Sequence, residues 1–482
     1  MLLKNITISN YRSVESQTIS FNRKSSDDSC TYGLIGVNEA GKSSILKAIA
    51  LVQGVVFPEQ KDFRRREQPI SVTFVYEIEN ADEVKLRQFL GESLQEIEQF
   101  SDQLHQLRVE YTFSYLNPSQ INVAHSVLTD NASYVFLENA MSFEPHRIVF
   151  WTAEPRFLIN EPIELARFAA NPKEVSIPLA NCFELAGITN VAERIAQLSG
   201  DSTEVEYLQS LLGQCVTDHI KQVWTGHPIE ISFLITDGKI HFHVKDVGAN
   251  GKAKTANQRS DGFRQFVSFL LTVSAQDRNQ QLANTLLLLD EPETHLHPQA
   301  QEYLLAELGR ITSNERNNIV LFATHSNFLI DKKDLTKTFR VEKINDATKL
   351  EHLVGTSVSY SGANYEVFGI ATSDYHNELY GKLHEDYIAE DEADEKRGGT
   401  KYFDKYFFQE VHELSADRPW KELQKQVSLC TYVRNVIHHP EAPRSFTEVE
   451  LRKSIELMRS IFAKNNNGKP SVMAATPTAR TS

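Results

Sequence analysis

Cysteine is scarce in this sequence, with four residues among 482. They lie far apart and no two form a C-x-x-C pair, which argues against a disulfide framework and against a zinc site of that type. This usage is typical of a protein in a reducing compartment, so we expect a cytoplasmic location. The four residues are Cys30, Cys182, Cys215 and Cys430.

Long apolar runs are also missing. No run of about 18 apolar residues occurs, so we expect no membrane-spanning helix and no membrane partner. The first five residues, M-L-L-K-N, lack the basic and then apolar pattern of a signal peptide. With 41% hydrophobic and 24% charged residues, the sequence predicts a globular protein of two or three domains.

Basic residues are outnumbered, since 50 Lys and Arg stand against 64 Asp and Glu and give a net charge of −14. This balance argues against nucleic-acid binding by the whole surface. It does not exclude binding in a local basic groove. The densest basic run comprises Lys61, Arg64, Arg65 and Arg66. So short a run is usually a solvated turn, and contact with nucleic acid is the alternative.

One motif dominates what is present. Residues 36–43 read G-V-N-E-A-G-K-S, a P-loop, between a predicted strand at 31–35 and a predicted helix at 44–51. Backbone N–H groups of such a loop form an anion cradle, Lys42 would reach the β- and γ-phosphates, and Ser43 would bind Mg²⁺. We therefore expect ATP and Mg²⁺ as cofactors. The expected nucleotide-binding residues of the loop are Gly36, Asn38, Gly41, Lys42, Ser43 and Ser44.

Two apolar runs predict neighbouring buried parallel strands at residues 284–290 and 318–325, joined by a helix at 298–311. The first strand ends in Asp290 and Glu291, which predicts a carboxylate for Mg²⁺ followed by a general base that polarises water. The second ends in His325, which we interpret as a sensor of the γ-phosphate. The predicted catalytic residues are therefore Glu291, His325 and Lys42, and the predicted metal ligands are Ser43 and Asp290.

A further helix is predicted to begin near residues 258–266, Q-R-S-D-G-F-R-Q-F. Ser260 and Gly262 at its start could offer a hydroxyl and bare N–H groups to a phosphate. The simpler alternative is that these residues only cap the helix.

The order of these motifs resembles the ABC-type ATPase heads of the RecF, SMC and OLD group. Residues 8–13, I-S-N-Y-R-S, are similar to the N-F-R-S opening of those heads, and residues 293–298, E-T-H-L-H-P, resemble OLD-type ATPases rather than transporters. The resemblance covers residues 1–345. It implies that Ser260 and Gly262 stand for the signature motif, which acts across a dimer on the partner's γ-phosphate, although L-S-G-G-Q is absent.

Two features of these families are missing from the sequence, and their absence reduces the number of families that the chain can resemble. No long heptad region occurs, which excludes an SMC-type coiled coil. OLD-type nucleases carry a TOPRIM domain after the head, and the sequence shows no convincing strand with a lone Glu followed by D-x-D. The head is therefore similar to the ATPase subunits of bacterial antiphage systems such as Septu or PARIS.

The expected fold class is α/β, a P-loop NTPase head with a mixed sheet, an antiparallel β-lobe and a helical lobe, followed by an α-helical domain. Alternation predicts antiparallel strands at 71–78 and 108–115, and a hairpin that turns at Asp237-Gly238. Residues 82–107 and 177–224 show helical spacing. The expected domains are a head at 1–345 with a helical insertion at about 155–225, a connector at 346–369, a helical domain at 370–465 and a disordered tail at 466–482.

The helical domain contains a second polar signal. A helix running from about residue 423 would place Arg434 on its apolar stripe, with His438 one turn on as partner. Pro440 would end this helix, and Thr447 with Glu450 predicts a capping box for the last one. Arg434 and His439 are similar to the R-x4–6-H motif of HEPN domains, several of which are ribonucleases. The alternative is an Arg–His network that only locks the bundle.

Three functions are compatible with these features. The first is an ATPase that dimerises on ATP, as a homodimer or higher homo-oligomer, and controls a separate nuclease or toxin effector in antiphage defence. The second is an ATP-gated ribonuclease that uses Arg434 and His439 on RNA. The third is a DNA-repair ATPase of RecF type, which the acidic balance and the helical tail disfavour.

Overall fold

The computed structural model forms two compact units, and each is described here by itself. The first unit contains Met1–Leu329 and Phe339–Glu351, and the second contains Ile330–Thr338 and His352–Ser482. The structure describes residues 1–22, 28–54, 57–79, 82–84, 86, 104–129, 134–137, 146–159, 162–198, 201–223, 229–247, 254–255, 258, 261–277, 283–294, 296–312, 317–353, 359–390, 395–420, 425–441 and 443–465.

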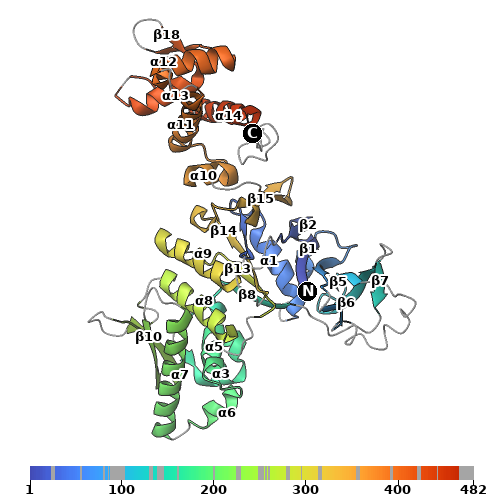
Figure 1. The fold of residues 1–482 in the computed structure, drawn as a ribbon. Helices are drawn as coiled ribbons and strands as arrows, with labels where there is room; N and C mark the ends of the chain where they lie inside the picture. Colours follow the sequence, from blue (N-terminus) through green and yellow to red (C-terminus); the bar gives the residue numbers. More distant parts are fainter. Residues whose placement is uncertain are drawn as a thin grey trace. The chain divides into compact units, whose positions relative to one another are not determined.

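A six-stranded sheet organises the first unit (Figure 1). Four of its six strands run parallel, namely β3, β14, β13 and β8. This confirms the prediction of two parallel strands that lead to Asp290 and His325. Every residue of β13 and β14 is buried, which explains why both read as continuous apolar runs. In order the strands are β16 (Ala347–His352), β15 (Thr338–Ile344), β3 (Thr31–Ile35), β14 (Ile319–Thr324), β13 (Thr285–Asp290) and β8 (Arg147–Thr152).

Two helices carry the connections of this sheet. Helix α1 (Lys42–Ala50) follows β3 and packs against β14 and β13. Helix α9 (Pro298–Thr312) joins β13 to β14, which confirms the predicted βαβ unit. Because the strands are parallel, their carboxyl ends meet at one edge of the sheet, where the predicted nucleotide motifs begin.

A second six-stranded sheet forms the antiparallel lobe of the first unit. It confirms the strands predicted near 71–78 and 108–115, which pair antiparallel. The helix predicted for 82–107 falls mostly outside the described residues. Residues 104–107 belong to a strand instead, in which Gln106 and Leu107 pair with the preceding strand and Leu104 pairs with the following one. In order the strands are β2 (Val14–Ser20), β1 (Leu2–Tyr11), β4 (Ile70–Glu77), β5 (Leu104–Phe113), β6 (Ile121–Thr129) and β7 (Tyr134–Leu137).

The third part of the first unit is a helical lobe with its own short sheet. The predicted hairpin is present, since β10 (Ile229–Thr236) pairs antiparallel with β11 (Lys239–Asp246) around Asp237 and Gly238. Strands β9 (Ile163–Glu164) and β12 (Lys254–Thr255) flank β11. The helices are α3 (Leu165–Ala170), α4 (Pro172–Val175), α5 (Ile177–Leu185), α6 (Val191–Ala196), α7 (Ser202–Val223) and α8 (Asp261–Asp277).

The second unit is mainly helical around an aromatic core. Ring contacts join Tyr380, Phe403 and Phe408, and α11 packs against both α13 and α14. Across the described ranges of the chain, no helix combines the length and apolar character needed to cross a membrane. The helices are α10 (Tyr360–Phe368), α11 (Ser373–Ala389), α12 (Thr400–Phe403), a π-helical segment (Asp404–Val411), α13 (Leu429–His438) and α14 (Glu448–Asn465).

The prediction of one helix from about residue 423 was wrong at its start. Residues Lys425–Val427 form β18, which pairs with β17 (Arg418–Trp420), and α13 begins only at Leu429. Ser428 caps α13 by accepting from the Thr431 N–H at 3.3 Å, while its own hydroxyl donates to Asp404 at 2.5 Å. This contact with a distant aspartate is tertiary, so helical spacing alone did not reveal it.

The capping box predicted for the last helix is confirmed. Glu450 Oε2 accepts from the Thr447 N–H at 2.8 Å, and Thr447 Oγ1 accepts from the Glu450 N–H at 3.2 Å. Residues 466–482, for which disorder was predicted, lie outside the described residues.

Candidate active site

The phosphate loop is formed by a buried strand, two glycines and a helix start. β3 ends at Ile35, and α1 begins at Lys42. Gly41 has φ 108°, and a Cβ there would lie 2.0 Å from Thr348 Oγ1. A Cβ on Gly36 would lie 2.1 Å from the carbonyl oxygen of Val341. Both glycines are therefore required, because β15 and β16 press against the loop.

Thr348 supports the loop from behind. Its hydroxyl donates to the Ala40 carbonyl at 3.1 Å and lies 2.7 Å from the hydroxyl of Ser13. No motif marks Thr348, which stands more than 300 residues away in sequence from the loop that it touches. Sequence reasoning missed it for that reason.

A cavity of about 610 Å³ opens over the loop. It contains most of the predicted nucleotide-binding residues together with the predicted base and sensor, while Arg12, Ser13, Glu39 and Lys343 were not predicted. Arg12 lies in the I-S-N-Y-R-S segment, so that segment was its available signal. The lining residues are Arg12, Ser13, Asn38, Glu39, Gly41, Lys42, Ser43, Ser44, Glu291, His325 and Lys343.

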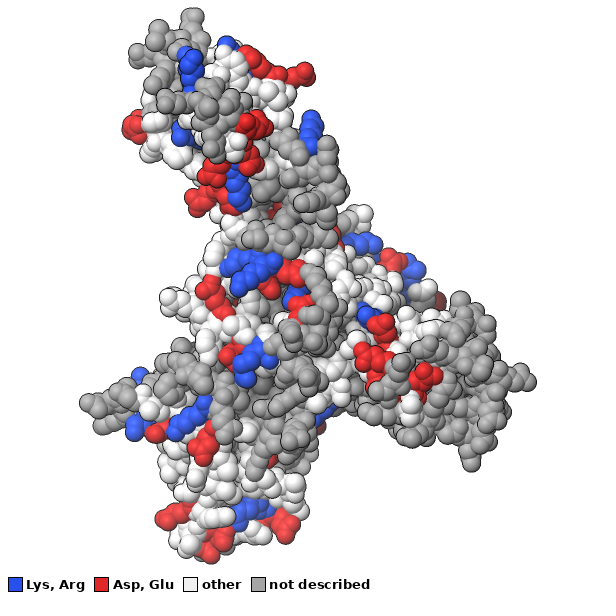
Figure 2. Space-filling model, in the orientation of Figure 1, with Lys and Arg blue, Asp and Glu red and all other residues white. Residues whose placement is uncertain are grey.

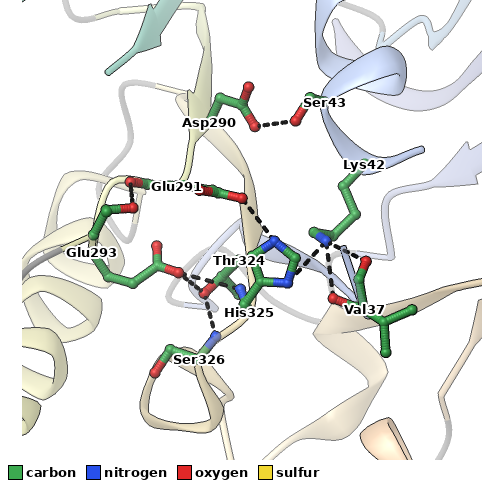
Figure 3. Close-up of polar contacts among 11 residues, drawn as sticks. Val37, Lys42, Ser43, Asp290, Glu291, Glu293, Thr324, His325 and Ser326 are labelled. Atoms are coloured by element: carbon green, nitrogen blue, oxygen red, sulfur yellow. Dashed lines mark hydrogen bonds and ion pairs between the residues drawn. The ribbon is translucent and has the colours of Figure 1, made fainter. Parts of the chain in front are cut away.

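Lys42 makes three hydrogen bonds with its ammonium group. Nζ donates to the carbonyls of Gly36 at 2.9 Å and Val37 at 3.0 Å, and it lies 3.2 Å from Nδ1 of His325 (Figure 3). Burial lowers the pKa of Lys42 to about 8, against the opposing attraction of Glu291 and the other nearby carboxylates. The group is thus mainly charged near pH 7, although its side chain is buried.

Ser43 and Asp290 meet across the two motifs. Ser43 Oγ donates to Asp290 Oδ1 at 2.8 Å, over a sequence separation of 247 residues. Burial raises the pKa of Asp290, while the Ser43 hydrogen bond opposes that rise. A hydroxyl and a carboxylate oxygen are hard donors that suit Mg²⁺, so the residues present fit the expected ion.

Glu291 and His325 form the next pair. His325 Nε2 lies 2.7 Å from Glu291 Oε1 (Figure 3). Glu291 has φ 52°, in the left-handed region, and its N–H donates to the Ala323 carbonyl at 3.0 Å. An ammonium can only donate, so Nδ1 of His325 accepts from Lys42, and Nε2 carries the proton that faces Glu291. A continuous line of hydrogen bonds therefore runs from Lys42 to Glu291.

Glu293 lies buried beside this line and was not predicted as a site residue. Its Oε1 accepts from the Thr324 hydroxyl and from the His325 N–H, the latter at 3.3 Å. Burial raises the pKa of Glu293 to about 7, while these hydrogen bonds oppose the rise. The available signal was its place in the D-E-P-E run.

Of the two predicted signature residues, the structure describes only Gly262. Ser260 lies outside the described residues. Gly262 is buried in the first turn of α8 and does not line the cavity.

In the second unit, Arg434 and His439 have separate partners. Arg434 donates to Asn435 Oδ1 at 3.0 Å and lies over the ring of Tyr380 at 6.0 Å. His439 is exposed, with Nδ1 3.3 Å from Glu441 Oε1. In the part of the chain that the structure describes, the hydrogen bonds of Arg434 and His439 do not join these two residues. Burial and the nearby charge of Arg434 lower the pKa of His438, the partner that the sequence suggested.

Each basic residue of the run at 61–66 has a local partner, and two of the four pair with a carboxylate. Arg64 donates to the Asp346 carbonyl, Arg65 pairs with Glu15, Lys61 pairs with Glu59, and Arg66 lies over the ring of Tyr115. Figure 2 shows Lys and Arg next to Asp and Glu on the described surface. This pairing agrees with the solvated turn predicted for the run.

Two family models match the stretches of the chain that contain the site. A model described as "AAA ATPase domain" matches residues 1–148, and one described as "AAA domain, putative AbiEii toxin, Type IV TA system" matches residues 216–331. The Old nuclease of Escherichia phage P2 is 21% identical over 417 residues, which are 77% of this chain. The chain spans 65% of the length of that relative.

Solved SMC heads are also similar to the chain. An SMC head bound to the C-terminal winged-helix domain of ScpA is 12% identical, covering 73% of this chain and 98% of its own, with a TM-score of 0.43. The SMC head domain from Thermotoga maritima is 14% identical, covering 73% and 99%, with a TM-score of 0.37.

The P-loop, the Walker-type strand and the His-bearing strand meet at one sheet edge, within regions that the ATPase models match. The relative that spans most of the chain is an Old nuclease. The chain is therefore similar to P-loop ATPases of the OLD type.

Proposed function

We propose that the chain binds ATP with Mg²⁺ in the cavity above the P-loop and hydrolyses it. The main support for this proposal is the hydrogen-bonded line Lys42–His325–Glu291, which lines the same cavity as Ser43, the hydrogen-bond partner of Asp290. These contacts bring together a cation (Lys42), a general base (Glu291) and two oxygen ligands for a metal ion (Ser43 and Asp290).

Each residue then has a definite task. The loop N–H groups and Lys42 would bind the β- and γ-phosphates and stabilise the charge that develops on transfer. Ser43 and Asp290 would hold Mg²⁺, which neutralises phosphate charge when bound. Glu291 would accept a proton from the attacking water, and His325 would orient Glu291 through the 2.7 Å contact.

The site also supports a regulatory role in a dimer. The cavity-lining residues come from the P-loop and the start of α1, the turn between β1 and β2, the residues that follow β13 and β14, and β15, and Gly262 is not among them. We propose that Ser260 and Gly262 of a second copy complete the site when ATP is bound. The chain would then control a separate nuclease or toxin effector in antiphage defence, a class supported by the Old nuclease relative and the toxin-type family model.

The test is phosphate release by wild type and by Glu291→Gln, which keeps the shape but loses the base. We expect the variant to bind ATP normally and to release phosphate at least about 100-fold more slowly. Glu206→Gln, on an exposed position of α7, is the matched control and should behave as wild type. A wild type without ATP hydrolysis, or a fully active Glu291→Gln, would overturn the proposal.

Dimerisation is tested with the same variant, because slow hydrolysis should preserve the ATP-bound state. Light scattering should report a monomer without nucleotide and a dimer of Glu291→Gln with ATP and Mg²⁺. Equal masses under both conditions would remove the dimer from the proposal and leave the ATPase intact.

A further inference from the structure

A buried carboxyl group lies directly behind the proposed reacting groups. We infer that Glu293 is a positioning residue for ATP hydrolysis, which fixes the Thr324–Ser326 turn so that His325 can bridge Lys42 and Glu291. This inference rests on the proposed ATPase function and adds a residue that acts on it from outside the cavity.

The contacts of Glu293 centre on the end of β14. Its side chain is 5% exposed, and Thr324 is fully buried. Glu293 Oε1 accepts from both the Thr324 hydroxyl and the His325 N–H, while Thr324 Oγ1 accepts from the Ser326 N–H at 2.9 Å. One carboxylate oxygen thus connects to three consecutive residues, directly or through one hydroxyl (Figure 3).

This turn determines where the imidazole of His325 stands. β14 ends at Thr324, so the backbone of His325 lies beyond the strand, and Glu293 supplies the acceptor for its N–H. The ring then lies 3.2 Å from Lys42 Nζ through Nδ1 and 2.7 Å from Glu291 Oε1 through Nε2. Because both distances are at hydrogen-bond length, a small displacement of the turn would break one or both.

Glu293 contacts the proposed reacting groups through His325. It does not line the cavity, whereas Glu291 and His325 do. Its second oxygen, Oε2, is buried and has no hydrogen-bond partner in the part of the chain that the structure describes. A buried carboxyl with one unsatisfied oxygen is costly for a purely structural contact, since a smaller hydroxyl or amide could cap the turn at lower cost. Such costs are typical of groups that serve a neighbouring active site.

The experiment separates turnover from nucleotide binding. Glu293→Ala removes the acceptor and should lower kcat by about 10-fold or more, with the KM for ATP changed less than about twofold. Glu293→Gln keeps an acceptor oxygen at the Oε1 position and should restore most of kcat. The exposed substitution Glu206→Gln is again the control.

A second variant keeps the test valid if Glu293→Ala folds poorly. Thr324→Val removes the hydroxyl that joins Glu293 to Ser326, and it should lower kcat in the same way with an unchanged KM. Since both variants break one connected unit, the double variant Glu293→Ala with Thr324→Val should be no slower than Glu293→Ala alone.

Three outcomes would overturn the inference. These are wild-type kcat in Glu293→Ala, no recovery of kcat in Glu293→Gln, or, where Glu293→Ala does not fold, wild-type kcat in Thr324→Val. Active wild type with an unaffected Glu293→Ala refutes only the positioning role. A wild type that does not hydrolyse ATP refutes the proposed function as well.

Discussion

The two units differ in how the sequence separation of their polar residues relates to contact in the structure. In the first unit, Lys42 and His325 are 283 residues apart in sequence and yet share a hydrogen bond. In the second unit, Arg434 and His439 are five residues apart, and each has a partner of its own. Nearness in sequence therefore did not indicate a shared site.

The architecture of each unit explains this difference. Parallel strands bring their carboxyl ends to one sheet edge, so residues that follow β3, β13 and β14 must converge. Two positions five residues apart differ by about 140° around the axis of an α-helix. Arg434 and a residue at position 439 would therefore lie on different faces of the helix. His439 also lies beyond the last residue of α13.

The largest effect should come from the cation of the first unit. Lys42→Ala removes the side chain that contacts the loop and His325, so we expect ATP hydrolysis to fall by at least about 100-fold. Steady-state phosphate release measures this loss. Lys382→Ala, on an exposed pair with Glu378 in α11, should leave the rate unchanged. Equal activity of Lys42→Ala and wild type would refute a catalytic role for the line of hydrogen bonds.

The second unit also buries a charge, in an ion pair between two buried side chains. Arg459 pairs with Glu366 and donates to the Tyr375 hydroxyl at 3.1 Å, and both charged residues are below 10% exposed. Burial raises the pKa of Tyr375 to about 12, which keeps that hydroxyl protonated near neutral pH. This network joins α10, α11 and α14 within the second unit.

Removing one partner of this buried pair should destabilise the second unit without affecting catalysis. Arg459→Met removes the positive charge that pairs with the buried carboxylate of Glu366, and breaking such a buried pair costs about 3–5 kcal/mol. Thermal unfolding should show a lower transition, while ATP turnover below that transition stays at the wild-type rate. The exposed change Lys382→Met should cost under about 1 kcal/mol. A turnover loss without unfolding would show that the two units are coupled.

Sequence predicted the sheet edge well because each motif there combines an apolar strand with polar residues at its end. The strand 285–290 and Asp290 are such a case, and so are 319–324 and His325. Thr348 and Val341 could not be predicted, because a threonine and a backbone carbonyl in ordinary strands carry no pattern. The start of α13 was missed because it depends on the Ser428–Asp404 contact, which joins distant segments.

The buried Glu293 should make the folding stability of the first unit depend on pH. Its folded-state pKa of about 7 lies above the unfolded value near 4.5, so the folded protein binds this proton more tightly. The resulting stability is fully present below about pH 4.5 and is lost as pH rises through 7, by roughly 3 kcal/mol in total. Gln cannot ionise, so Glu293→Gln should gain melting temperature relative to wild type between pH 5 and 8.

The control for this pH effect is Glu206→Gln, whose difference from wild type should stay constant over the same range. A constant difference for Glu293→Gln would contradict the raised pKa. Glu291 contributes to that rise as a like charge nearby, so Glu291→Gln should shift the effect slightly to lower pH.

The smallest effect is expected for Arg434 and His439 in the second unit. Arg434→Ala loses one hydrogen bond to Asn435, and His439→Ala loses an exposed contact with Glu441. The double variant should hydrolyse ATP within about twofold of wild type, because an exposed pair contributes under about 1 kcal/mol. RNA incubated with each protein and ATP should show the same pattern on a gel. An RNA cleavage that wild type performs and the double variant lacks would reverse the comparison, since the second unit would then hold a catalytic site of its own.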